Sequence, residues 1–127
     1  MRYTREASGT IEQVGERLVA AATANQFGVL GVHDLKKKMA AKGVELGPEC
    51  RIFEVCNPVQ AKRVLEADMS ISTALPCRIS VYEEGGGVKV STLKPTALLA
   101  LFGTKEVEPI ARSIEDAIIR IIDAACR

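Results

Sequence analysis

An apolar stripe near the C-terminal end of the chain limits the fold more than any other sequence feature. Its residues recur at helical spacing: Ile110, Ile114, Ala117, Ile118, Ile121, Ile122 and Ala125. This spacing predicts a closing amphipathic helix with one buried side. Ile119 extends the apolar surface around much of this helix, so a second side is free to contact another subunit. We therefore expect a homodimer or a higher homo-oligomer.

The rest of the chain alternates between strand and helix patterns. Strand patterns cover residues 2–8, 27–33, 51–56, 77–83 and 88–93. Helices are predicted to begin after Thr10, Asp34 and Asn57, because these side chains cap free amides at a helix start, and another at Pro95. The 27–33 segment is short and apolar, which predicts a buried strand whose glycines admit a close approach to the backbone.

This order of elements predicts the α+β class. Strands that alternate with helices and end in a hairpin at residues 85–87 indicate a two-layer sandwich. We expect a mixed, mainly antiparallel sheet with helices packed on it. The chain has 127 residues and no internal repeat or linker, so residues 1–127 are expected to form a single domain.

Charge and hydropathy argue against two classes of partner. Lys and Arg total 17 and Asp and Glu total 16, so the net charge of +1 gives no field that would attract nucleic acid or an anionic membrane. The most apolar run, residues 97–102, is too short to cross a bilayer. The polar N-terminal residues do not resemble a signal peptide, so we expect a cytoplasmic location with the four cysteines reduced.

Two cysteines occupy positions that bear on thiol reactivity. Cys56 precedes the Asn57-Pro58 helix start, where free amides and the helix dipole favour a thiolate. Cys77 shares a strand face with Ile79 and Val81, which predicts burial. One reading is sulfur or redox chemistry at Cys56 with Cys77 as the resolving thiol, and the other is that both thiols pack in the core.

His33 is the only histidine and the best candidate for a metal ligand. Strand alternation places its ring on the same face as Phe27 and Val29. The simpler interpretation is an imidazole that bonds a nearby carboxylate or carbonyl. In a two-fold dimer, however, two copies of His33 could ligate one haem from opposite faces.

Several motifs together resemble the family known as domain of unknown function 302. They are Phe27-Gly28-Val29-Leu30, His33-Asp34-Leu35, Cys56-Asn57-Pro58, Leu75-Pro76-Cys77-Arg78 and Pro95. The resemblance covers nearly the whole chain and implies a compact α+β domain that forms at least dimers. The resemblance does not imply a particular biochemical activity. His33 departs from the residue found in many relatives, which suggests haem binding in a subgroup.

These observations support three hypotheses. The first is a small-ligand-binding or electron-transfer module, without enzymatic activity: a homodimer that binds non-covalent haem b through His33 of each subunit. Its apolar walls are expected to be Phe27, Val29, Leu98, Leu99 and Phe102. The second is cysteine chemistry at Cys56 and Cys77. The third is an interaction domain that binds no ligand.

Overall fold

Five strands form one sheet in which every neighbouring pair is antiparallel. The computed structural model describes all residues from 1 to 127. The strands are β1 (Arg2–Ala7), β2 (Gly28–Asp34), β3 (Cys50–Cys56), β4 (Cys77–Glu84) and β5 (Gly87–Leu93). Their order across the sheet is β1-β5-β4-β3-β2. The predicted α+β sandwich is confirmed, and no parallel pair is present, so the sheet is antiparallel rather than mixed.

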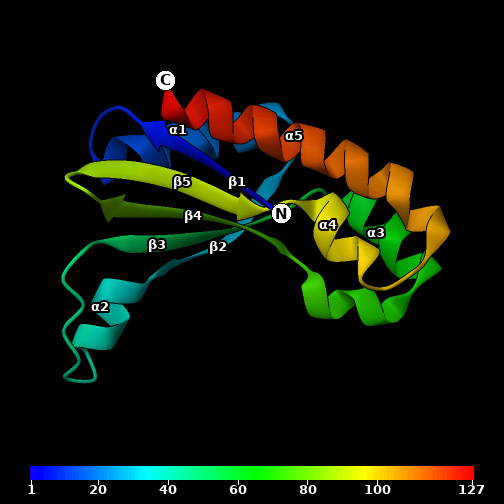
Figure 1. Ribbon diagram of the computed structural model, residues 1–127, viewed down its shortest axis with the longest axis horizontal. Coiled ribbons are helices and arrows are strands. Elements are labelled where there is room, and N and C mark those ends of the chain that lie inside the picture. Colours follow the sequence, from blue (N-terminus) through cyan, green and yellow to red (C-terminus); the bar gives the residue numbers. More distant parts are fainter.

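Five α-helices and two short 3-10 helices complete the fold. The α-helices are α1 (Ile11–Ala24), α2 (Leu35–Ala40), α3 (Pro58–Ala67), α4 (Pro95–Ala100) and α5 (Glu108–Cys126), and the 3-10 helices are η1 (Met69–Ala74) and η2 (Lys105–Val107). Helices α1 and α5 lie side by side over one face of the sheet, while α3, α4 and η1 gather at one end of it (Figure 1). The other face of the sheet has no helical layer.

The core lies between the sheet and the α1–α5 layer. Leu18 of α1, Ile121 of α5 and Val81 of β4 are fully buried there. Burial of side chains of this size contributes roughly 1.5–3 kcal/mol each, which offsets the loss of conformational freedom on folding. No helix combines the length and the hydropathy needed to span a membrane.

The capping and turn residues predicted from the sequence are found where helices and strands begin and end. The side chain of Thr10 accepts a hydrogen bond from the amide of Gln13, and the Gln13 side chain accepts one from the Thr10 amide, which completes the capping box of α1. Asn57 accepts bonds from the first free amides of α3. Gly85 and Gly86 join β4 and β5 with positive φ angles of 62° and 81°, the conformation of a tight hairpin turn.

The predicted buried side of α5 is confirmed, whereas the prediction that the segment 27–33 is a buried strand was wrong. The apolar stripe of α5 is covered by α1, α4 and the sheet of the same chain, and Ile119 beside it is half-buried. Strand β2 is at the sheet edge rather than buried, and Leu30 remains 64% exposed. Nothing approaches its glycines unusually closely, since a Cβ at Gly31 would lie 3.5 Å from Glu54 Oε1.

Candidate functional site

A cleft lined mainly by hydrophobic residues lies at one end of the sheet. It has a volume of about 380 Å³ and is lined by 13 residues, eight of them hydrophobic. Its walls come from η1, the start of β4, the end of β5 and α4: Thr73, Ala74, Leu75, Pro76, Cys77, Arg78, Thr92, Leu93, Pro95, Leu98, Leu99, Leu101 and Phe102. The size and lining are those of a small-molecule site. We call this cavity the apolar cleft.

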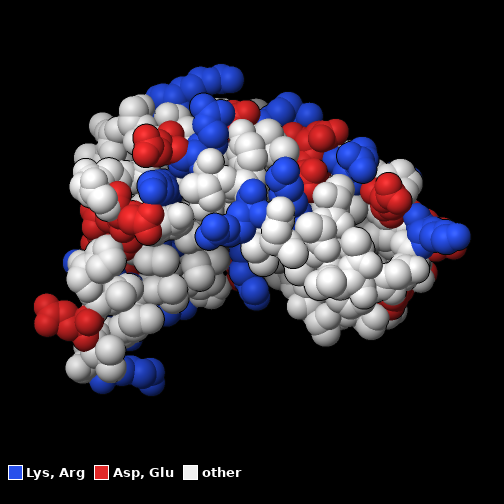
Figure 2. Space-filling view, in the orientation of Figure 1, with Lys and Arg blue, Asp and Glu red and all other residues white.

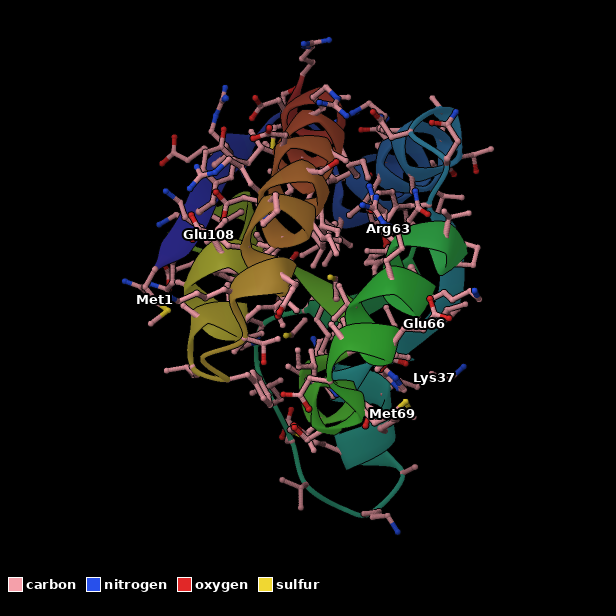
Figure 3. All side chains as sticks on the ribbon, turned by 90° about the vertical axis from the view of Figure 1, so that its right-hand side faces the viewer. Met1, Lys37, Arg63, Glu66, Met69 and Glu108 are labelled. Carbon is pink, nitrogen blue, oxygen red and sulfur yellow. The ribbon has the colours of Figure 1, made fainter.

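The chain route explains why these residues meet. Strands β4 and β5 are antiparallel neighbours, so the first residues of β4 lie beside the last residues of β5. Pro76, whose peptide bond is cis, joins η1 to β4, and Pro95 starts α4 directly after β5. Figure 3 looks onto this end of the molecule, with α4 on the left and α3 and η1 on the right. The same region is largely free of charge in Figure 2.

Leu98, Leu99 and Phe102 line the apolar cleft, but Phe27 and Val29 do not. Phe27 is buried in the core, and Val29 packs against it. Both side chains belong to the helix-covered side of the sheet. The structure therefore brings together three of the five apolar residues that were expected to surround a cofactor.

His33 lies on the opposite face of the sheet from Val29, which corrects the prediction from strand alternation. The register shifts between Val29 and Gly31: Val29 pairs with Val55, whereas Gly31 pairs with Glu54. This β-bulge inserts one residue and reverses which face the following side chains occupy. His33 pairs with Ile52 and faces the same side as Glu54. A bulge cannot be recognised from alternation alone.

Both ring nitrogens of His33 have partners. Lys38 Nζ donates a hydrogen bond to Nδ1 at 2.7 Å, so the proton of the ring is on Nε2, which donates to Glu54 Oε1 at 3.0 Å. Arg78 Nε is 3.7 Å from Glu54 Oε2. The hydrogen bond from His33, with a smaller contribution from the charge of Arg78, lowers the pKa of the Glu54 carboxyl. This geometry agrees with the simpler interpretation of His33, an imidazole that forms a hydrogen bond with a nearby carboxylate.

This arrangement does not fit an axial haem ligand. Iron needs a ring nitrogen with a free lone pair, and the only such pair, on Nδ1, accepts the bond from Lys38. His33 is also not among the residues that line the apolar cleft. In addition, no three His, Cys, Asp or Glu side chains are grouped to hold a metal ion.

Cys56 and Cys77 line one small cavity of about 10 Å³ between the sheet and α3. Burial raises the pKa of Cys56, and burial together with the nearby Cys56 raises the pKa of Cys77 to about 11. For Cys56, burial therefore acts against the thiolate that the helix start was expected to favour. Asn57 Oδ1 accepts the amides of Val59 and Gln60, so these amides are not available to the sulfur. Because both pKa shifts disfavour the thiolate, they argue against the use of either cysteine as a nucleophile.

Sequence reasoning missed Arg78, the one charged residue that lines the apolar cleft. A signal for it was present, because strand alternation places Arg78 on the face opposite Cys77, away from the core. Glu54 could have been found in the same way, as the outward residue between buried Phe53 and Val55.

Comparison with known proteins agrees with the arrangement of helices and strands. The model of the family described as "Domain of unknown function DUF302" matches residues 3–125. The chain belongs to the DUF302 family. A solved structure of an uncharacterized conserved DUF302 protein from Bacillus stearothermophilus is 33% identical in sequence. The match covers 99% of this chain and 98% of that one, with a TM-score of 0.94. No curated protein matches this chain.

Three of the five motifs on which the family resemblance rests meet around the candidate site. Leu75-Pro76-Cys77-Arg78 supplies one wall of the apolar cleft, and Pro95 starts the helix that supplies another. Cys56-Asn57-Pro58 forms the adjoining strand-to-helix junction, next to the small cavity behind Cys77. The two motifs that begin at Phe27 and at His33 lie outside the apolar cleft.

Proposed function

We propose that this DUF302 protein is a small-ligand-binding module, without catalytic activity, whose ligand occupies the apolar cleft. The proposal rests on the cleft itself: about 380 Å³ lined mainly by hydrophobic side chains and open at the surface. Leaving such a surface in water is unfavourable by roughly 25 cal/mol per Å² of apolar area. A ligand with an apolar body removes that contact with water.

The side chains of the cleft support binding rather than catalysis. Three lining residues carry a nucleophilic group: Cys77, whose raised pKa keeps the thiol protonated, and Thr73 and Thr92, whose hydroxyls donate to the backbone carbonyls of Ser70 and Arg78. No histidine or carboxylate lines the cleft to act as a general base. The four free cysteines also support a reducing, cytoplasmic location as part of this proposal.

A neutral, apolar fluorescent probe, N-phenyl-1-naphthylamine, tests the proposal. We expect it to bind the wild-type protein with enhanced fluorescence. Leu98→Glu places a charge inside the cleft and should weaken binding at least about tenfold, because an unpaired charge in an apolar site is costly. Leu101→Glu is a second variant for the case in which Leu98→Glu does not fold, since Leu101 lines the cleft but is already 76% exposed.

Leu30→Glu is the matched control, because Leu30 is an exposed leucine outside the cleft. Equal probe binding by wild type, Leu101→Glu and Leu30→Glu would contradict the proposal. Haem binding in a homodimer stays a prediction with its own test. A Soret band in protein from haem-replete cells that disappears in His33→Ala would support it, and would require Lys38 and Glu54 to release the ring in the dimer.

A further inference from the structure

We infer that the ligand of the apolar cleft is an amphipathic monocarboxylate whose carboxylate binds the guanidinium of Arg78. The inference deepens the proposed function and depends on it. Among the 13 residues around the cleft, Arg78 is the only one with a charged side chain. Polar groups in such a site set the orientation of the ligand, so one cation beside apolar walls selects an apolar body with one anionic end.

The guanidinium of Arg78 is available to a ligand. Its side chain is 65% exposed, and its contact with Glu54, at 3.7 Å, is longer than a hydrogen bond. Its planar fork of N–H donors matches a carboxylate in a bidentate arrangement. The backbone beneath it is well held, because Thr92 Oγ1 of β5 donates a 2.7 Å hydrogen bond to the Arg78 carbonyl oxygen. An exposed cation with one ion-pair partner, Glu54, therefore extends from β4 at the edge of the cleft.

The neighbours of Arg78 leave one positive charge uncompensated. Glu54 is the only anion paired with Arg78, and its other oxygen already accepts the bond from His33. On the far side of His33 is the ammonium of Lys38. The side chains of Arg78, Glu54 and Lys38 together carry two positive charges and one negative charge, an excess of one positive charge. A ligand with a single negative charge balances it, whereas a neutral ligand does not.

The open face of the sheet gives such a ligand a path to water for its charged end. The molecule is hollowed beneath the sheet, between the end that carries α2 and the uncharged lobe of η1 and α4 (Figure 2). Arg78 is on this uncovered face, opposite Glu54 in the pairing of β3 and β4. The apolar tail would enter the lobe while the carboxylate stays at the solvated rim, which avoids burying an ion.

Isothermal titration with octanoate and with 1-octanol tests the inference, because the two probes share a tail and differ in charge. We expect octanoate to bind wild type more tightly than octanol. Arg78→Gln should weaken octanoate binding roughly tenfold, the size expected for a charge-assisted pair at a partly exposed site, and leave octanol binding unchanged. Arg63→Gln is the matched control, because Arg63 is exposed on α3 and does not line the cleft (Figure 3).

The two proposals fail in different ways. If octanol and octanoate bind wild type equally, and Arg78→Gln changes neither, the carboxylate inference is wrong while the cleft remains a binding site. If Arg78→Gln and Arg63→Gln weaken octanoate equally, the effect is one of net charge, and the inference is also wrong. If neither probe nor the neutral fluorophore binds, the proposed function itself fails.

Discussion

Cys77 is expected to be almost unreactive in the folded protein at mildly alkaline pH, where an ordinary cysteine reacts readily. The thiolate is the reactive form, so the rate follows its fraction. Burial raises the pKa of Cys77 from 9.0 to about 11. At pH 8 a thiol with a pKa of 9.0 is about one-tenth ionised, and one with a pKa of 11 about one-thousandth. The folded protein should therefore react roughly a hundredfold more slowly than the unfolded chain.

The assay uses a variant in which Cys77 is the only cysteine, with Cys50, Cys56 and Cys126 replaced by alanine. Alkylation by iodoacetamide is followed by mass spectrometry in native buffer and in denaturing urea. Because the pKa is raised, the native rate should keep rising by about tenfold per pH unit beyond pH 9, where the unfolded rate levels off. A variant that retains only Cys50, which is half-exposed, controls for labelling through transiently unfolded molecules.

A native rate at pH 8 within about fivefold of the rate in urea, with circular dichroism showing a folded protein, would refute this reasoning. The result would mean that Cys77 is not desolvated in its cavity. It would also return Cys56 and Cys77 to consideration as a redox or sulfur-transfer pair. A slow rate removes Cys77 as the resolving thiol that this hypothesis requires.

Two further predictions concern stability. Leu18→Ala should lower the free energy of unfolding, measured by urea titration, by about 3 kcal/mol, because Leu18 of α1 is fully buried against the sheet. A loss below about 1 kcal/mol would show that neighbouring side chains collapse into the cavity. Asn57→Ala should lower the free energy of unfolding by about 1 kcal/mol in the same assay, because Asn57 caps two amides of α3. Asn57→Asp keeps a hydrogen-bond acceptor and should lower it much less. Equal losses of stability in the two variants would contradict the capping role.

Residues that are close together in the sequence were sufficient to predict most of the helices and strands. The capping box at Thr10, the Asn57-Pro58 start of α3 and the Gly85-Gly86 hairpin depend on residues within a few positions of one another. Gly43 has a positive φ of 79° just beyond α2, a conformation that favours glycine at the end of a helix. Such signals act through short-range hydrogen bonds and backbone sterics, so they can be read without knowing the fold.

The candidate site could be predicted only in part. Leu98, Leu99 and Phe102 were recognised as an apolar wall because they belong to one short segment. Their partners between η1 and β4 and within β4, including Leu75 and Arg78, are about twenty residues or more away in sequence. These partners reach the cleft only through the strand order. The hydrophobic periodicity of one segment does not indicate which other segments will lie next to it in the fold.

The sequence by itself determined the element types, the α+β class and the amphipathic face of α5, because these depend on local propensity and spacing. Tertiary structure alone decided the face occupied by His33, where a bulge in β2 reversed the alternation. Strand alternation predicted the burial of Cys77, but the size of its pKa shift depends on side chains that are distant in sequence. Both outcomes depend on packing between segments, and pairwise register and burial are properties of the assembled fold.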